Sequence, residues 1–280
     1  MAKLSFLYDV HLDMPIDAQL DRKHSSERDL AVQHLKVTED NDLLLYDRGY
    51  YAYWFVLLHV LQKREFCFRL KKNACNQVKD FIDSGKKQQI IMLNPTKDMY
   101  QKAQDKNLVS VEVKVRLVRI KTSKGYYILM TSLTDKKRYS TNDFYSLYHL
   151  RWRVEEGFKK QKAFLDVEDF SGRTVHSVKQ DIHASVLIQA LVAIESFASN
   201  PLIKRKVKQR EYGYKINFSM AIKSFKSRIV RVLTGSLDVQ EIYLWLKSLA
   251  QNLTIIKPDR SFDRAKVRCK REKLRDGYKV

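Results

Sequence analysis

"LLLYDRGYYAYWFVLLHVLQKREFCFRL", residues 43–70, decides the predicted fold class. Its first four residues form a short apolar strand that stops at Asp47, and Gly49 permits the chain to turn. Residues 51–64 have the composition of a helix, and residues 65–72 again favour a strand. A strand, a helix and a second strand in this order predict a parallel pair in an α/β core.

The segments on either side extend this pattern. Residues 29–42 predict a helix that ends in polar residues, and residues 72–108 form a more polar stretch that contains Pro95. In "VEVKVRLVRI", residues 111–120, apolar and basic side chains alternate, which predicts a half-exposed strand. "KTSKG" then supplies a turn and "YYILMTSL", residues 126–133, runs back, so the two runs predict a β-hairpin.

The second half of the chain is predicted to be mostly helical. Ser140 or Thr141 is expected to cap a helix that carries residues 148–162, with Asp143 in its first turn. From "QDIHASVLIQALVAIESFA" onward the pattern remains helical, with an interruption expected near Pro201.

The composition indicates a globular protein with a polyanionic partner. The chain has 280 residues, 44% of them hydrophobic and 11% aromatic, which is enough for a substantial core. Its formal net charge is +21, which favours nucleic acid over a membrane as partner, since no amphipathic lysine helix dominates. Residues 257–280 are polar and mostly basic, as in a mobile tail or arm. A ribosome-like or merely solubilising basic surface is the alternative explanation.

Cysteine usage and hydropathy predict a cytoplasmic protein. Cys67, Cys75 and Cys269 are odd in number and lack C-x-x-C spacing, so neither a zinc site nor a disulfide framework is expected. We interpret them as buried or incidental thiols in a reducing compartment. The apolar part of "MAKLSFLYDV" is too short for a signal peptide, and no apolar run approaches the roughly 18 residues of a membrane span.

"YHLRWRVEEGFKKQK", residues 148–162, places two adjacent glutamates among basic and aromatic side chains. At about 100° per residue on a helix, four side chains fall within roughly 60° of one another. These four are Tyr148, Arg151, Glu155 and Lys162. The apolar stripe beside them consists of Leu147, Val154, Phe158 and Leu165. Glu156 lies roughly 100° further round, so we expect Glu155 at the edge of the buried face and Glu156 in water.

Asp47 and Glu155 are the candidate acids of a catalytic site. A lone aspartate at the end of a strand is most often a turn or cap residue, but here a second carboxylate points inward from a later helix of a strongly basic chain. Carboxylates that converge at strand ends can hold Mg²⁺, a hard cation that prefers oxygen ligands. Paired ions about 3.5–4 Å apart can activate the attacking oxygen and stabilise the leaving oxygen in phosphodiester chemistry. Nearby lysines and arginines would bring phosphates to such a negative site.

Tyr148, Arg151, Glu155 and Lys162 also match, residue by residue, the Y-R-E-K signature of bacterial insertion-sequence transposases. The chain resembles the DDE transposase family, in the branch named after insertion sequence four. "RW.VE..FK..K" around the glutamate, "DRGY" at Asp47 and the later "QDIHA" are similar to the same family. So are the early "LYDV", "IDAQL" and "SERDLAVQHL" and the late "PDRSFDRAKVRCK", so the resemblance covers nearly the whole chain.

The resemblance implies an α/β fold with an RNase H-like core and a helical C-terminal part. A β-rich insertion, roughly residues 72–134, would lie between the second and third catalytic acids. Asp47 would be the second aspartate of the triad and Glu155 its glutamate, and both would hold Mg²⁺ or Mn²⁺. The residues that would contact DNA phosphates near the cleaved transposon end are Tyr148, Arg151 and Lys162.

The remaining residues of the signature stretch are expected to have structural roles. Trp152 is expected in the core rather than stacked on a base. Glu156, Lys159 and Lys160 are interpreted as residues of a solvated face, although the two lysines could add phosphate contacts.

The chain departs from the family at its front. The family's first catalytic aspartate ends an early strand and is followed by Gly and Ser or Thr, whereas the Asp-Gly of this chain, Asp276-Gly277, lies in the tail. Asp9, Asp13 and Asp17 are available acids that match positions beyond that first strand. We therefore expect a truncated transposase, with a catalytic domain over residues 1–256 and a basic tail over residues 257–280.

The expected function is metal-dependent cleavage of transposon ends and strand transfer into target DNA, by a homodimer in a synaptic complex. Water or a 3′-hydroxyl would be the nucleophile, and the protein would be nucleoid-associated when bound to DNA. A non-catalytic DNA-binding transposase remnant is the alternative, and the ability to complete the acid triad separates the two. An RNA-binding basic protein would not explain the carboxylate on the signature helix.

Overall fold

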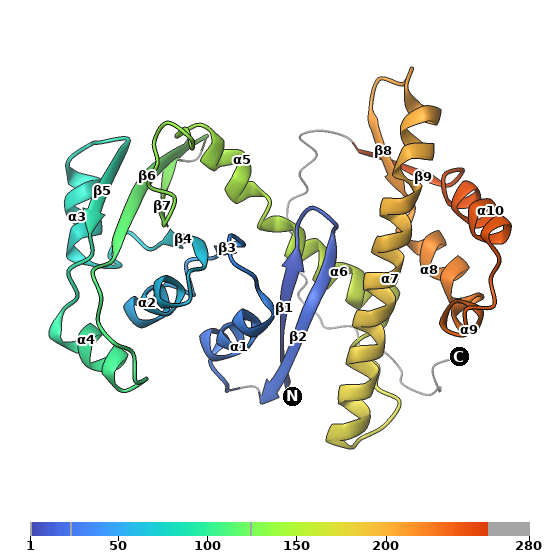
Figure 1. Ribbon diagram of the computed structural model, residues 1–280, viewed down its shortest axis with the longest axis horizontal. Coiled ribbons are helices and arrows are strands. Elements are labelled where there is room, and N and C mark those ends of the chain that lie inside the picture. Colours follow the sequence, from blue (N-terminus) through green and yellow to red (C-terminus); the bar gives the residue numbers. More distant parts are fainter. Residues whose placement is uncertain (1, 23, 124, 257–280) are drawn as a thin grey trace, which may run out of the picture. The chain divides into compact units, whose positions relative to one another are not determined.

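The computed structural model describes residues 2–22, 24–123 and 125–256 (Figure 1). The chain divides into two compact units. The first unit contains the residues up to 10 and residues 17–155, and the second contains residues 11–16 and the chain from residue 156 onward. We describe each unit by itself. The predicted basic tail lies outside the described residues, as do Cys269 and the Asp-Gly pair.

The first part of the chain forms seven strands, five α-helices and one short 3₁₀ helix within the described residues. Their bounds are β1 (Ala2–Asp9), β2 (Met14–Arg22), α1 (Glu27–His34), the 3₁₀ helix (Leu35–Val37), β3 (Leu43–Tyr46), α2 (Tyr53–Leu61), β4 (Glu65–Leu70), α3 (Asn76–Asp83), β5 (Gln88–Met92), α4 (Lys97–Gln104), β6 (Lys114–Thr122), β7 (Gly125–Thr131) and α5 (Asp143–His149). Helix α6 (Trp152–Phe164) begins in the first unit and continues into the second.

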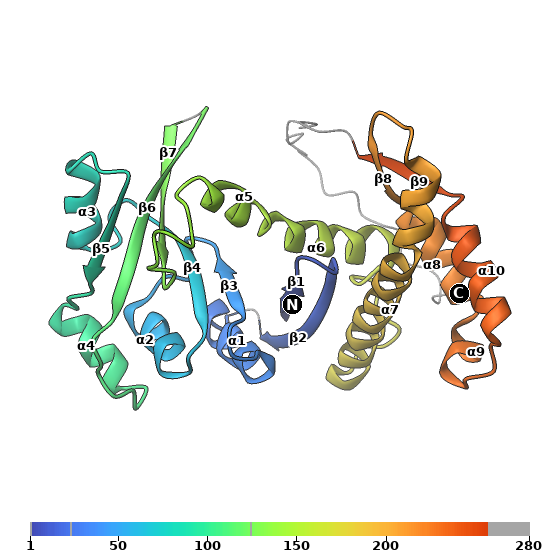
Figure 2. The same cartoon turned by 45° about the horizontal axis from the view of Figure 1, so that its top comes forward.

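A five-stranded mixed sheet with the order β3-β4-β7-β6-β5 forms the centre of the first unit (Figure 2). Strands β3 and β4 are parallel, with Tyr46 opposite Phe68, and every other neighbouring pair is antiparallel. The predicted parallel pair and the predicted hairpin of β6 and β7 are therefore both confirmed. Strands β1 and β2 form a separate two-stranded sheet.

Helices cover both faces of this sheet, which corrects the half-exposed strand predicted for residues 111–120. Leu117 of β6 belongs to the core on the α2 face, whereas Val118 packs with Phe144 of α5 on the opposite face. Even Arg116 is fully buried on the α5 face, where its guanidinium donates to the Tyr139 carbonyl at 2.8 Å. The alternating pattern correctly predicted which side chains lie on each face of the strand. It did not predict that the second face is covered, because the covering helix α5 comes from a later segment of the chain.

The signature stretch folds as two helices rather than one. Helix α5 ends at His149 and α6 begins at Trp152, and the turn between them has short-range backbone bonds such as Arg151 N–H to the Tyr148 carbonyl at 3.2 Å. The predicted caps Ser140 and Thr141 are wrong. Residue 142 precedes the helix without a side-chain cap, and the Asp143 carboxylate instead accepts from the Ser140 backbone N–H at 3.0 Å.

The second unit is mostly helical within its described residues. Its elements after α6 are α7 (Val175–Val207), β8 (Gly213–Ile216), α8 (Phe218–Lys226), α9 (Ile229–Leu233), α10 (Val239–Leu249) and β9 (Leu253–Ile256), with β8 and β9 paired antiparallel. Its core contains Val192, Ile203, Phe225 and Trp245. The interruption expected near Pro201 is wrong, because α7 runs through this proline. Proline removes one backbone donor, and the remaining bonds of a long packed helix can outweigh that loss.

Helix α7 contains a stretch that is long and apolar enough to cross a membrane by length and composition alone, which corrects the expectation that no apolar run approaches that length. The helix contributes Val192 and Ile203 to the core of the second unit. Its Gln189 is fully buried and accepts from the Gln161 side-chain amide at 2.6 Å. Buried polar groups with partners are typical of a globular core, so this one helix does not indicate a membrane protein.

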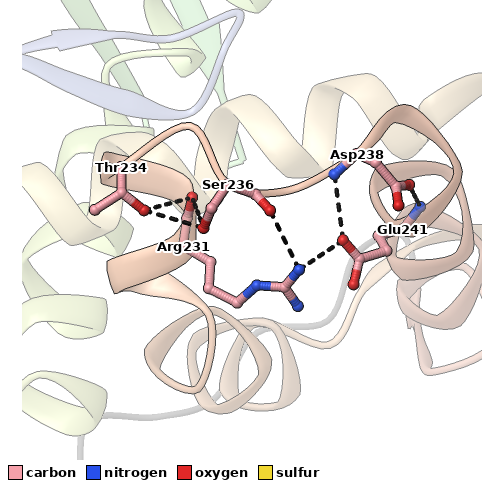
Figure 3. Close-up of polar contacts among 5 residues, drawn as sticks. All are labelled: Arg231, Thr234, Ser236, Asp238 and Glu241. Atoms are coloured by element: carbon pink, nitrogen blue, oxygen red, sulfur yellow. Dashed lines mark hydrogen bonds and ion pairs between the residues drawn. The ribbon is translucent and has the colours of Figure 1, made fainter.

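The corner between α9 and α10 is fixed by a capping box (Figure 3). The Asp238 carboxylate accepts from the Glu241 backbone N–H at 2.7 Å, and the Glu241 carboxylate accepts from the Asp238 backbone N–H at 3.2 Å. Arg231 of α9 donates to the same Glu241 carboxylate at 2.6 Å. This reciprocal pairing satisfies donors at the start of α10 and joins the two helices.

Candidate functional site

Asp47 lies at the carboxyl end of β3, in a tight turn. Its side chain accepts from the Arg48 backbone N–H at 2.8 Å, and its carbonyl accepts from the Tyr50 backbone N–H at 3.0 Å. Arg28 of α1 holds the same turn from outside, donating to the carbonyls of Tyr50 at 3.1 Å and Gly49 at 2.9 Å. The "DRGY" motif is thus a turn that keeps Asp47 half-buried at the strand end.

A buried aromatic cluster supports the end of β3. His59 of α2 is fully buried, and burial lowers the pKa of His59 to about 4, so its ring is neutral near pH 7. Its two ring nitrogens lie 2.7 Å from the Phe55 carbonyl and 2.9 Å from the Tyr46 hydroxyl. A carbonyl only accepts, so Nδ1 of His59 donates to Phe55 and Nε2 accepts from Tyr46. Tyr46 also stacks on Phe68 of the neighbouring strand, with ring centroids 4.7 Å apart.

Tyr148 connects α5 to this strand end. The residue is only 3% exposed, and its hydroxyl donates to the backbone carbonyl of Tyr46 at 3.2 Å. Burial raises the pKa of Tyr148 above its usual value, although the charge of Arg151 opposes this. The side chain therefore contacts the residue directly before Asp47.

Arg151 contacts one candidate acid and is influenced electrostatically by the other. Its guanidinium donates to the Glu155 carboxylate at 3.0 Å, and only 11% of the arginine side chain is exposed. Burial acts to lower the pKa of Arg151, but the hydrogen bond to Glu155 and the negative charges around it, including Asp47, raise the pKa above its usual value. The guanidinium also lies 5.8 Å from the ring centroid of Tyr148 and 5.1 Å from that of Trp152. Asp47 and Glu155 thus share one electrostatic partner within the first unit.

The expected difference between the two adjacent glutamates is confirmed. Glu156 is exposed, whereas the Glu155 side chain is 32% exposed. The core position expected for Trp152 is wrong, because 45% of this residue is exposed. Helix α6 begins at Trp152 after a turn, so a single continuous helical wheel does not describe the whole signature stretch.

The lysines of α6 differ from one another. Lys159 is exposed, as expected. The solvated position expected for Lys160 is wrong, since only 14% of its side chain is exposed and its ammonium lies 2.6 Å from the Asp13 carboxylate. Lys162 belongs to the second unit, has 59% of its side chain exposed and forms an ion pair with Glu168 at 2.7 Å.

The partners of two early acids, Asp13 and Asp17, are structural. The Asp17 carboxylate lies 2.7 Å from Nδ1 of His34 and accepts from the Gln19 amide at 2.8 Å, whereas Asp13 pairs with Lys160. Asp9 is the last residue of β1. Within residues 2–22, 24–123 and 125–256, no group of three or more His, Cys, Asp or Glu side chains could hold a metal ion.

The two acids near Arg151 are of the ligand type that a hard cation prefers. Asp47 and Glu155 offer carboxylate oxygens, the ligands that Mg²⁺ prefers. The thiols of the described residues are elsewhere: Cys67 is fully buried in the sheet, where burial raises its pKa to about 12, and Cys75 precedes α3. One Glu155 oxygen is already hydrogen-bonded to Arg151, so these two residues alone supply a partial ligand set.

Sequence reasoning missed the residues that hold the acids in place. His59 looks like one more residue of an apolar helix, and nothing in its local pattern indicates the bond to Tyr46. Arg28 precedes the turn by about twenty positions, and its two carbonyl contacts depend on how α1 packs.

Comparison with known proteins identifies the class of protein to which this fold belongs. The family model described as "Transposase DDE domain" matches residues 1–191, more than half of the chain, and the chain belongs to this family. The matched range includes the turn at Asp47 and the whole signature stretch.

A curated relative is also a transposase. The chain is similar to the transposase InsG for insertion sequence element IS4 from Escherichia coli strain K12, at 30% identity over 172 residues. The similarity covers 60% of this chain and 37% of that transposase, so the chain spans well under half the length of this relative. The resemblance to the insertion-sequence-four branch is confirmed.

Proposed function

We propose that this chain binds transposon-end and target DNA and supplies two acids, Asp47 and Glu155, to a metal-dependent site for DNA cleavage and strand transfer. The observation that carries the proposal is the position of Arg151, whose side chain is only 11% exposed, bonded to Glu155 and attracted by the charge of Asp47. A buried guanidinium with two acidic neighbours is a costly arrangement, and such clusters are typical of functional sites.

The residues of this chain would divide the work as follows. Asp47 and Glu155 would hold Mg²⁺ or Mn²⁺, which supplies Lewis-acid activation of water or a 3′-hydroxyl when bound. Arg151 and Lys162 would bind phosphates of the cleaved strand, and Tyr148 would join them as its match to the signature implies. The net charge of +21 would attract DNA from a distance.

The fold supports the same proposal. Strands β3 and β4 with α2 between them form a parallel unit whose carboxyl end carries Asp47. We propose that this unit belongs to an RNase H-like core and that residues 72–134 are the insertion between the second and third acids. The strands of that segment continue the same sheet as β3 and β4. A homodimer in the synaptic complex is part of the proposal.

The test measures DNA binding, metal binding and cleavage separately. We expect the 280-residue chain to bind transposon-end duplexes, with an affinity that falls steeply with salt, because phosphate contacts release counterions. Cleavage or joining with Mg²⁺ or Mn²⁺ is not expected from the chain alone, because its described residues offer no group of three metal-ligating side chains. Binding of Mn²⁺ by the DNA complex, followed by electron paramagnetic resonance, should weaken in Glu155→Gln.

Glu156→Gln is the matched control, since it makes the same chemical change one residue away on an exposed position. Equal loss of Mn²⁺ binding in both variants would refute the assignment of Glu155. The non-catalytic alternative predicts tight DNA binding and no difference in Mn²⁺ binding between wild type and either variant.

A further inference from the structure

A surface pocket of about 220 Å³ lies beside the turn that carries Asp47. Strands β3 and β4 are parallel, so the segments that follow them emerge at the same edge of the sheet. The pocket is formed between these segments and the start of α1. Its lining consists of Arg28, Arg48, Tyr51, Lys71, Asn73 and Ala74.

The lining carries three cationic side chains and no acidic one. Arg28 is held in place by the two backbone carbonyls of the turn, which are neutral partners. Among the described residues, no salt bridge within 4.0 Å involves Arg28, Arg48 or Lys71. Three like charges around one small space repel one another, and an anion in that space would relieve the repulsion.

The pocket has the chemistry of a phosphate site. Arginine and lysine offer only donors, and both bind phosphate oxygens, arginine through a planar fork and lysine as a point charge. The side chains of Asn73 and Tyr51 can add neutral donors. The volume is below the roughly 300 Å³ at which pockets for drug-sized ligands begin, so it suits a phosphate group rather than a whole cofactor.

We propose that this pocket binds one backbone phosphate of the DNA strand next to the cleavage site, independently of base sequence. This inference rests on the proposed function, because it assumes that DNA reaches the edge of the sheet at Asp47. The pocket is separate from the phosphate contacts proposed for the signature residues, because its lining does not include Tyr148, Arg151 or Lys162. It would fix the position of the DNA backbone relative to Asp47.

The first experiment compares two double variants of the full chain. R48Q/K71Q removes two pocket charges that are both exposed, and K114Q/K121Q removes two exposed charges of β6 in the same unit. Dissociation constants for a transposon-end duplex are measured between 50 and 200 mM salt. The pocket variant should lower the slope of log Kd against log[salt] by about 1, as expected for the loss of one phosphate contact, and the control should lower it clearly less.

The second experiment identifies the phosphate itself. Single neutral methylphosphonates are placed at each position along the duplex, and binding is measured for wild type and R48Q/K71Q. A methylphosphonate at one position should weaken DNA binding by wild type and leave DNA binding by R48Q/K71Q unchanged, because a contact that the variant has already lost cannot be lost again. Additive losses at every position would overturn the proposal.

The outcomes separate this inference from the proposed function. If wild type binds no DNA, both fail. If wild type binds DNA and R48Q/K71Q behaves like K114Q/K121Q, only the pocket assignment fails. Binding of inorganic phosphate to the free chain, seen by phosphorus nuclear magnetic resonance, together with no methylphosphonate-sensitive position, would assign the pocket to free phosphate and overturn the DNA assignment.

Discussion

Acidification should weaken the first unit through His59, the buried histidine beneath the end of β3. Burial lowers the pKa of His59 from 6.5 to about 4. The folded protein therefore keeps the ring neutral between these values, while the unfolded chain takes up a proton. The stability due to the neutral ring is fully present above pH 6.5 and is lost as the pH falls to 4. A difference of about 2.5 pKa units, at about 1.36 kcal/mol per unit, corresponds to about 3 kcal/mol.

The main assay is urea unfolding at several pH values from 7 to 4. Hydrogen exchange of the α2 amides, measured at the same pH values, is a second readout. Wild type should lose about 3 kcal/mol more of its free energy of unfolding over this range than His59→Gln, which does not titrate. His24→Gln is the matched control, because it removes an exposed histidine of the same unit. His34, whose pKa is also lowered by burial, is present in all three proteins and cancels in the comparison.

Nuclear magnetic resonance of the His59 ring gives an independent check. A titration midpoint near 4 agrees with the neutral ring that donates to Phe55 and accepts from Tyr46. A midpoint between 6 and 7, or equal pH dependence of wild type and His59→Gln, would refute the reasoning.

The other predictions concern single side chains. Tyr148→Phe removes the hydroxyl that donates to the Tyr46 carbonyl and should cost about 1 kcal/mol in urea unfolding; a weaker salt dependence of DNA binding would instead indicate a lost phosphate contact. Trp152→Ala should change the free energy of unfolding by no more than about 0.5 kcal/mol, because nearly half of the residue is exposed, and a larger loss would place the ring in the core. Arg116→Met should destabilise by about 2–3 kcal/mol, because it leaves buried acceptors without their donor, whereas exposed Lys114→Met should not; equal effects would contradict the burial of Arg116.

Local patterns predicted the centre of the sheet well. Residues 43–70 predicted β3, α2 and β4 correctly, because each element is short and bounded by polar or turn residues. Alternation in residues 111–120 likewise identified β6. What alternation could not give was the burial of Arg116, because that depends on α5, which is distant in sequence and covers the second face of the sheet.

The helical wheel succeeded for Glu155 and Glu156, whereas the separate expectations for Trp152 and Lys160 were wrong. Both glutamates lie within one uninterrupted helix, where the angle of about 100° per residue holds. Lys160 is also in this helix, but its partner Asp13 comes from a segment far away in sequence. Angles that include Tyr148 cross the turn between α5 and α6, which a single wheel cannot represent.

The geometry gives two of the signature residues a structural task in addition to the proposed DNA contact. Tyr148 holds the strand end directly before Asp47, and Arg151 holds Glu155, so two signature residues position the two acids. A guanidinium has five donors, and the buried Nε of Arg151 has no hydrogen-bond partner among the described residues. Arg151 could therefore donate to Glu155 through one nitrogen and to a phosphate through another. Because only 11% of its side chain is exposed, the side chain would have to move outward to reach the phosphate. Lys162, with more than half of its side chain exposed, needs only to exchange Glu168 for a phosphate. In the proposed DNA complex, phosphate binding by Arg151 would thus compete with its bond to Glu155, and phosphate binding by Lys162 would compete with its ion pair to Glu168.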